Sequence, residues 1–455
     1  MPAAEFDLIV SGRVVTPARV LEAGYVGVRG GRIAAIGQDD PLPSARRSVR
    51  VEHAYVLPGI VDTHVHTRSE PAEGITRGTE SAVAGGVTTI ADMPYDMPAA
   101  VPDVETFVQK VADVGAQAVA DVALYGTIRK EGGLDQIERL ASAGACAFKL
   151  ATYEADPVRF PRIADGEMLA AFRRIAATGL PAAVHCENQD IADRGVAEER
   201  AAGRTGPLAH AWSRPPISET EAVGRVLELA YDTGVRLHIV HASVPRSFDL
   251  VQRYREEGVR VTAETCIQYL VLDEAAMERL GALAKINPPL RRCEHVDALW
   301  RYLAAGRIDQ VTSDHAPWAR SRKAEVDIFL NASGAPGVET LLPLLYHSGV
   351  ASGRISILEL VRLLAEQPAR IFGLFPRKGM LAPGADADIT ILDPEAVWTI
   401  RGKDLHSAAG WTPYEGMEIR GRVVETFVRG QPAYEDGVVV AHPGDGEFVR
   451  PAADA

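Results

Sequence analysis

The sequence has few basic residues relative to acidic ones. Its 455 residues include 48 Lys and Arg against 61 Asp and Glu, which gives a formal net charge of −13 at pH 7. A field of this sign repels phosphate backbones and anionic membrane surfaces. No cluster of Lys and Arg marks a nucleic-acid footprint either. We therefore expect neither nucleic acid nor a membrane as a partner.

Cysteine and long apolar runs are also scarce. The four cysteines, Cys146, Cys186, Cys266 and Cys293, form no CxxC pair, which argues against a disulfide framework or a zinc ribbon and favours reduced, buried thiols. No run reaches the roughly 18 consecutive apolar residues that span a membrane. The first residues lack the basic start and apolar stretch of a secretory signal. These absences predict a soluble, cytoplasmic protein.

Short strand-like runs rich in β-branched residues lie near both ends of the chain, at 6–10, 25–28, 32–36, 387–392 and 423–430. Turn-forming residues such as Gly30 and Gly31 separate the first runs. We expect residues 1–57 to form a small antiparallel sheet that residues 380–455 extend. Both termini would then build one β-sandwich side domain.

Residues 58–379 alternate short apolar runs with amphipathic stretches. This alternation predicts parallel strands covered by helices. The apolar runs lie at 87–90, 145–148, 182–184, 237–240 and 310–312. Their number within roughly 320 residues favours an α/β fold of the TIM type, a (β/α)8 barrel.

Residues able to bind a metal follow several of these apolar runs. His64 and His66 stand two positions apart. Because strand side chains alternate, both imidazoles point to the same face and can bind one ion. The carboxyl ends of barrel strands form the active-site face. Four further candidates follow other runs: Lys149, His185, His241 and Asp314.

A lysine in such a set requires a chemical explanation. An ammonium group repels cations and has no lone pair to donate, so Lys149 must be modified or deprotonated. Burial lowers the pKa of lysine and favours its reaction with carbon dioxide. The product, N6-carboxylysine, is a carbamate with two oxygens that can bridge two divalent ions.

The order of these residues resembles the amidohydrolase superfamily, and within it the cyclic amidases: hydantoinase and dihydropyrimidinase, allantoinase, and dihydroorotase. The resemblance covers nearly the whole chain. The motifs that carry it include Asp62-Thr63-His64-Val65-His66, Phe148-Lys149, His185-Cys186-Glu187-Asn188, Val240-His241, Glu264-Thr265-Cys266, Ser313-Asp314-His315 and Pro413-Tyr414-Glu415-Gly416.

The resemblance implies a hydrolase with two divalent metal ions, usually zinc. The implied ligands are His64, His66, Lys149 and Asp314 for the buried ion, and carboxylated Lys149, His185 and His241 for the second. A hydroxide shared between the ions would attack the ring carbonyl, and Asp314 would carry its proton to the departing nitrogen. The implied reaction opens a hydantoin- or dihydropyrimidine-like ring and gives an N-carbamoyl amino acid. Relatives of this kind are usually homodimers or homotetramers.

Four further residues match substrate-binding positions of the family. Arg68 falls where dihydroorotases bind a substrate carboxylate, a task suited to guanidinium, although a loop arginine paired with a nearby glutamate is an equally good interpretation. Tyr153 lies near the position of a tyrosine that supports the oxyanion. Asn287 and Gly337 match positions that contact the ring amide, largely through backbone groups.

The sequence leaves the substrate open. Tyr95 and Gln268 stand where dihydroorotases carry asparagine and histidine, which favours a hydantoinase, whereas His185-Cys186-Glu187-Asn188 resembles allantoinases. Three more distant hypotheses are a single-metal deaminase built on His185 and Glu187, a linear-amide hydrolase of the D-aminoacylase or dipeptidase type, and a scaffold without activity. The presence of every metal ligand argues against the scaffold.

Overall fold

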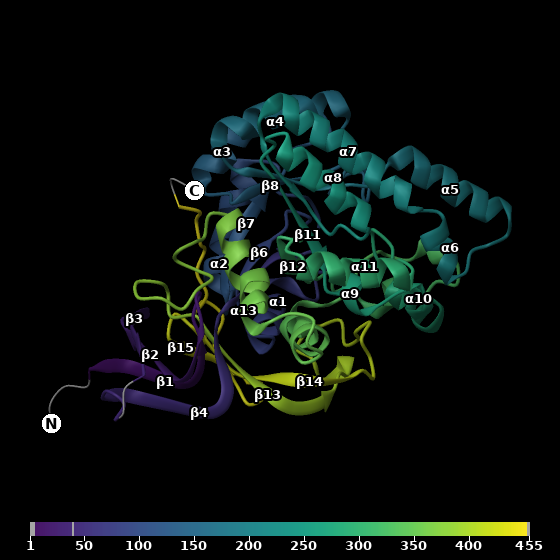
Figure 1. Ribbon diagram of the computed structural model, residues 1–455. Coiled ribbons are helices and arrows are strands. Elements are labelled where there is room, and N and C mark those ends of the chain that lie inside the picture. The colour runs from purple at the N-terminus through teal and green to yellow at the C-terminus, as the bar shows by residue number, and fades with distance from the viewer. Residues whose placement is uncertain (1–4, 39–40, 453–455) are drawn as a thin grey trace.

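The computed structural model describes residues 5–38 and 41–452; residues 1–4 and 453–455, the ends of the two predicted terminal segments, lie outside that range. A parallel sheet of eight strands forms the centre of the molecule (Figure 1). Its strands are β5 (Ile60–Val65), β6 (Val87–Asp92), β7 (Asp121–Gly126), β8 (Ala147–Ala151), β9 (Pro181–His185), β10 (Arg236–Ile239), β11 (Val261–Cys266) and β12 (Gln310–Thr312).

Each of these strands pairs with the next along the chain, in the order β5 to β12. A parallel bridge between Val65 and His315 brings the two ends of the sheet together. Nearly every residue of the strands is buried, as expected for a parallel sheet covered on its outer face by helices. The predicted (β/α)8 barrel is therefore confirmed.

Helices surround this barrel, and α5 and α6 project away from it (Figure 1). Helices α3 and α4 end at Gly144 and Gly179, whose φ angles of 107° and 75° favour glycine. No helix of the described ranges is long and apolar enough to cross a membrane.

The α-helices are α1 (Gly74–Ala84), α2 (Val104–Gln117), α3 (Gln136–Ala143), α4 (Asp165–Thr178), α5 (Gln189–Ala201), α6 (Pro207–Trp212), α7 (Pro216–Thr233), α8 (Pro245–Glu256), α9 (Gln268–Val271), α10 (Glu274–Leu280), α11 (Cys293–Ala304), α12 (Leu341–Leu345), α13 (Ile357–Val361) and α14 (Gln367–Ile371).

Short helical turns complete the barrel loops. The 3-10 turns are η1 (Gly281–Ala284), η2 (Arg320–Lys323), η3 (Ile328–Leu330), η4 (Val338–Thr340) and η7 (Gly402–Asp404), and the π turns are η5 (Tyr346–Val350) and η6 (Arg362–Glu366).

The predicted side domain contains strands from both ends of the chain, which lie together below the barrel in Figure 1. Its eight-stranded sheet has the order β16-β15-β14-β13-β4-β1-β2-β3. The N-terminal strands are β1 (Phe6–Val15), β2 (Val20–Arg29), β3 (Arg32–Gly37) and β4 (Ala45–Pro58); the C-terminal strands are β13 (Ile389–Thr399), β14 (Glu418–Val428), β15 (Gln431–Glu435) and β16 (Val438–Val439).

One detail of the N-terminal prediction is wrong. Strands β1, β2 and β3 are antiparallel neighbours, but β4 pairs with β1 in parallel. The chain crosses over the sheet after β3, and β4 then joins the opposite edge of β1. Turn residues mark where a strand ends, not which edge the next strand joins. On its other side β4 pairs antiparallel with β13, which connects the two termini.

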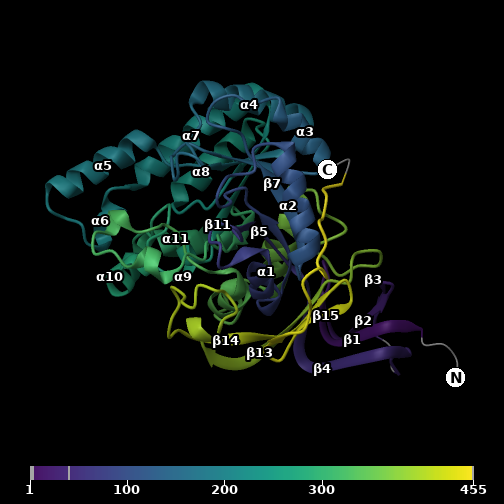
Figure 2. The ribbon, with the colours of Figure 1, turned by 180° about the vertical axis from the view of Figure 1, so that it is seen from behind.

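A buried charge cluster joins the barrel to the side domain. The ammonium of Lys378 lies 2.5 Å from Asp121 at the start of β7, 3.0 Å from Asp386 and 2.7 Å from Asp388. All four side chains are almost completely buried. The C-terminal segment returns along α2 (Figure 2), where Val122 and Val449 share a backbone hydrogen bond of 2.8 Å.

The cysteines are free thiols, as expected, but they are not all buried. Cys146, Cys186 and Cys266 lie in the interior, whereas Cys293 is exposed at the first residue of α11. The polar residues around Cys293 in the sequence place it on the solvent side of an amphipathic helix.

Candidate metal centre

The six predicted metal ligands meet at the carboxyl end of the barrel. His64 and Lys149 lie within β5 and β8, and His185 is the last residue of β9. His66, His241 and Asp314 follow the ends of β5, β10 and β12. All six line one cavity with a volume of about 490 Å³. Parallel strands thus place at one edge residues that are far apart in the sequence.

Three of the candidate ligands lie close enough together to bind one ion. His64 Nε2 lies 3.2 Å and His66 Nε2 lies 3.5 Å from the same oxygen, Asp314 Oδ1. The ligand atoms of these three residues lie within 4.8 Å of one another. Two imidazoles and a carboxylate suit a divalent transition metal such as zinc.

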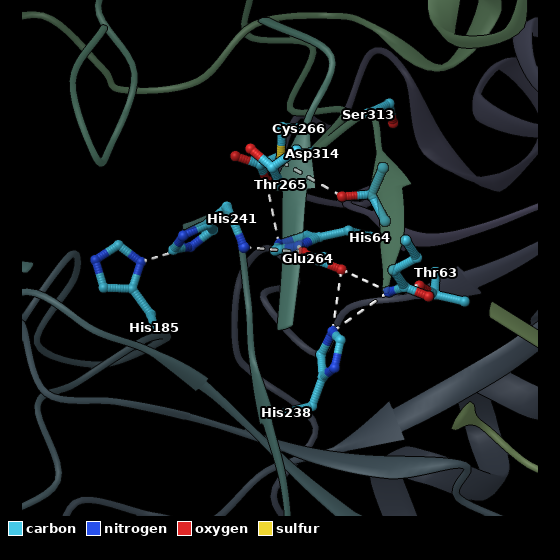
Figure 3. A network of polar contacts seen from close by, with 12 residues as sticks. Thr63, His64, His185, His238, His241, Glu264, Thr265, Cys266, Ser313 and Asp314 are labelled. Carbon is cyan, nitrogen blue, oxygen red and sulfur yellow. Dashed lines mark hydrogen bonds and ion pairs between the residues drawn. The ribbon is translucent and has the colours of Figure 1, made fainter. Parts of the chain in front are cut away.

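A second group lies beside the first (Figure 3). His185 Nδ1 is 2.9 Å from His241 Nε2, and the rings of His64 and His241 are 5.3 Å apart. Burial, together with the nearby His185 and Lys149, holds the pKa of His241 well below its usual value. His241 is therefore a neutral imidazole, the form that binds metals.

Among the candidate ligands, Lys149 has a buried amine whose hydrogen-bonding capacity is unused. Its Nζ is buried and has no hydrogen-bond partner among the described residues. Burial lowers the pKa of Lys149 to about 8. An uncharged amine is the form that reacts with carbon dioxide, so the surroundings of Lys149 fit a carbamate and the two cations it would bridge.

Two of the candidate ligands occupy strained backbone positions. His241 has φ of 41° and Asp314 has φ of 47°. This left-handed region is uncommon for residues other than glycine, and such positions cluster at functional sites. The backbone N–H of His241 donates to Glu264 Oε1 at 3.1 Å, which helps to hold this conformation.

Glu264 on β11 is the main site residue that the sequence did not identify beyond its motif. Its carboxylate lies 2.5 Å from His64 Nδ1 and also accepts from His238 and Gln310, at 3.2 Å and 2.7 Å (Figure 3). Burial raises its pKa, but His64 and His238 bring it well below the usual value. Glu264 is thus ionised and orients the His64 ring. A glutamate inside an apolar strand was the available signal.

Glu187 contacts the ring of His185 as Glu264 contacts the ring of His64. Its Oε2 lies 2.8 Å from His185 Nε2, and its Oε1 lies 3.4 Å from the guanidinium of Arg214. Arg214 also donates to the hydroxyl of Tyr153 at 2.5 Å. Glu187 is completely buried behind His185, so it positions that ligand rather than facing the cavity as a deaminase glutamate would.

The four predicted substrate contacts divide into two pairs. Tyr153 and Asn287 line the cavity, and Asn287 Oδ1 is buried without a hydrogen-bond partner among the described residues. Arg68 and Gly337 are not among the residues that line it. The guanidinium of Arg68 donates to Asp113 at 2.7 Å, and the N–H of Gly337 donates to His315 at 3.1 Å.

Known amidohydrolases match this chain over nearly its whole length. The family model described as Amidohydrolase family matches residues 55–433. An allantoinase of Rubrobacter xylanophilus is 39% identical over 450 residues, and an L-hydantoinase of Paenarthrobacter aurescens is 35% identical over 451; each alignment covers 98% of both chains. The solved structure of the L-hydantoinase (dihydropyrimidinase) from Arthrobacter aurescens has a TM-score of 0.95 at 34% identity, covering 98% of this chain and 100% of that one. A D-hydantoinase structure has a TM-score of 0.92 at 33% identity, with the same coverage.

Proposed function

Because this chain belongs to the amidohydrolase family and is a cyclic amidohydrolase acting on a small molecule, we propose that it opens a hydantoin- or dihydropyrimidine-like ring. A ring C–N bond is hydrolysed, and the product is an N-carbamoyl amino acid. The observation that carries the proposal is the meeting of the six candidate metal ligands in the lining of one cavity.

We propose that the cavity holds two divalent ions, for which zinc is the best match because imidazole dominates the ligand set. His64, His66 and Asp314 would hold the first, His185 and His241 would hold the second, and N6-carboxylated Lys149 would contribute to both. The carbamate forms when the Lys149 amine adds to carbon dioxide and loses a proton. When bound, such ions lower the pKa of water and polarise a carbonyl oxygen.

Asp314 is the proposed proton carrier. Burial raises its pKa, but His64 and His66 bring the pKa below the usual value, so the carboxylate is ionised at neutral pH. It can accept a proton as water attacks the ring carbonyl carbon. It can then deliver that proton to the ring nitrogen as the C–N bond breaks, which an amide requires because its anion is a poor leaving group.

The side chains that line the cavity suggest how the ring is bound. The hydroxyl of Tyr153, held by Arg214, is the proposed donor to the developing oxyanion. Asn287 is the proposed partner of the ring amide. Gly337 has less support as a ring contact, because it does not line the cavity and its N–H donates to His315 at 3.1 Å. A carboxylate-binding role for Arg68 has no support from its ion pair with Asp113, which weakens the dihydroorotase alternative.

Allantoin is the second candidate substrate, because the 39% identical relative is an allantoinase. The experiment that tests the proposal is ring opening by metal-replete protein, measured on 5-substituted hydantoins, dihydrouracil, allantoin, dihydroorotate and a simple cyclic imide. Opening of a hydantoin or dihydropyrimidine supports the proposal. If no ring opens while acyl amino acids are hydrolysed, the cyclic-amide assignment is wrong.

We further propose that the protein is a cytoplasmic homodimer or homotetramer. Two large apolar side chains support self-association: Trp212 and Ile217, at the junction of α6 and α7, are 47% and 56% exposed. Light scattering coupled to size-exclusion chromatography measures the assembly directly. A monomer at micromolar concentration contradicts this part of the proposal.

A further inference from the structure

The cavity contains a buried arginine whose hydrogen-bonding capacity is only partly used. Arg159 lies between β8 and α4, lines the cavity, and has a side chain only 6% exposed. Its Nε donates to Asp156 at 3.1 Å and its Nη2 donates to the hydroxyl of Tyr95 at 3.3 Å. Its Nη1 is buried and has no hydrogen-bond partner among the described residues. A buried donor without a partner is rare and costly.

We propose that Arg159 selects the substituent carried by the substrate ring, by donating from Nη1 to an oxygen of that substituent. This inference rests on the proposed function, since it assumes that a cyclic amide occupies the cavity. The substrate class it points to is a ring whose side group bears a hydrogen-bond-accepting oxygen, either a carboxylate or the carbonyl of a ureido group. Rings with purely apolar side groups are disfavoured.

The loop around Arg159 fixes the guanidinium before substrate binds. The carboxylate of Asp156 accepts from the backbone N–H groups of Val158 and Arg159, at 3.0 Å and 2.9 Å, in addition to Arg159 Nε. The N–H of Phe160 donates to the carbonyl of Asp156 at 3.0 Å and closes the turn. A guanidinium held in this way loses little conformational entropy when it binds a ligand.

Aromatic rings lie between Arg159 and the candidate metal ligands. Its guanidinium lies over the ring of Tyr95, 4.5 Å from the centroid. The Tyr95 ring is 5.8 Å from His66, and the neighbouring Phe160 ring is 6.4 Å from His185. Arg159 is therefore separated from the metal ligands by one layer of rings. A substrate ring near the ligands can direct its side group to Arg159.

The surrounding charges favour an oxygen acceptor over an apolar group. Asp156 balances the charge of Arg159, but a second guanidinium, Arg322, stacks on Trp318 at 4.6 Å in the same cavity lining. Arg322 is exposed and adds positive charge to this lining. An apolar side group would cover Nη1 without satisfying it, and sites built to donate a hydrogen bond reject ligands that lack the acceptor.

The test compares kcat/KM of metal-replete protein for two pairs of hydantoins. One pair bears oxygen at the side group, allantoin (5-ureidohydantoin) and hydantoin-5-acetic acid; the other bears propyl or isobutyl. We expect the unmodified protein to prefer the first pair. Arg159→Met should lower kcat/KM for the preferred oxygen-bearing ring by about 10- to 100-fold, the effect of losing a hydrogen bond to a charged donor, and change the apolar pair less than about threefold.

Two further variants separate recognition from a structural effect. Arg159→Lys keeps the charge but loses the planar fork, and should give an intermediate loss. Arg162→Met removes an arginine of the same loop that pairs with Asp190 at 3.5 Å and does not line the cavity; it should leave the preference unchanged. A preference for the ureido ring identifies a neutral carbonyl as the acceptor that Arg159 binds. A preference for the acetate identifies a carboxylate as that acceptor.

Two results overturn the inference while leaving the proposed function intact. One is a preference of the unmodified protein for the apolar pair. The other is an equal loss on all four rings in Arg159→Met, which indicates that Arg159 only maintains the loop. If the unmodified protein opens no ring at all, the proposed function itself fails, and the selection by Arg159 fails with it.

Discussion

At the scale of single residues, the tasks proposed for Lys149 and Asp314 can be separated by experiment. Lys149→Ala removes the group proposed to bind both ions, so we expect loss of metal and of turnover. Asp314→Asn keeps the size of the side chain but not its capacity to accept a proton, so turnover should fall by about 100-fold or more with metal largely retained. Metal analysis of the purified variants beside ring-opening rates checks both. Near-normal activity in either variant contradicts the mechanism.

Glu264 offers a second residue-scale prediction. Glu264→Gln keeps the shape of the side chain but removes the charge opposite His64 Nδ1. Loss of a carboxylate behind a metal-binding histidine weakens metal binding by about 10- to 100-fold. Titration of the metal-free variant with zinc measures this change. Glu278→Gln, at an exposed glutamate of α10, is the matched control; equal affinities in both variants refute the positioning role.

The meeting of the six candidate metal ligands in one cavity could be predicted from the sequence, because each lies at or near the end of an apolar run and parallel strands bring such positions together. Glu264 and Arg159 could not be assigned roles in this way. The partners of Glu264 lie on β5, β10 and β12, and those of Arg159 depend on how one loop folds against Tyr95. Contacts of this kind depend on the packing of distant segments, which no local pattern records.

At the scale of elements, the motif residue Asn188 has a structural task. Its side-chain oxygen accepts from the N–H of Ile191 at 3.0 Å and caps α5. Asn188→Ala should lower the free energy of unfolding by about 1 kcal/mol, the usual value of such a cap. Asn188→Ser, which can still cap the helix, should cost much less. Chemical denaturation measures both, and equal stability of the two variants contradicts the capping role.

Among the strands, the sequence pattern predicted the positions of most barrel strands but not one strand pairing of the side domain. Apolar runs located β6, β8, β9, β10 and β12, because buried parallel strands require continuous apolar side chains. The parallel neighbour of β1 escaped prediction, because pairing between β1 and β4 depends on a crossover that leaves no periodic signal. Local patterns thus identified the elements, and long-range pairing decided their neighbours.

At the scale of the whole molecule, Lys378 connects the barrel and the side domain. Lys378→Met leaves three buried carboxylates, Asp121, Asp386 and Asp388, without their shared cation. Breaking a buried ion pair from one side costs about 3–5 kcal/mol, so we expect a clear fall in the melting temperature. Arg370→Met, at a half-exposed pair on α14, is the control and should have little effect. Equal melting temperatures of the two variants contradict this role.

A second contact between the two parts predicts a pH dependence. His406 Nδ1 lies 3.0 Å from Glu339 Oε1, and this hydrogen bond raises the pKa of His406 above 6.5. A raised pKa gives stabilisation that is complete below the unfolded pKa and is lost as the pH rises through the folded pKa. His406→Gln should therefore destabilise the protein more at about pH 5.5 than at about pH 9. Melting curves at both values check this, with the exposed His442→Gln as control; a pH-independent difference refutes it.

The pairing of β4 with β13 also constrains how the protein is made. The ribosome releases β4 roughly 330 residues before β13, which at about 5–20 residues per second amounts to on the order of 20–60 s. During that interval one edge of the N-terminal sheet has no neighbouring strand, and open edges invite pairing with other chains. Newly made chains are therefore open to such pairing while the barrel is being synthesised, and overproduction at a slower rate of initiation, which lowers their concentration, should increase the soluble yield.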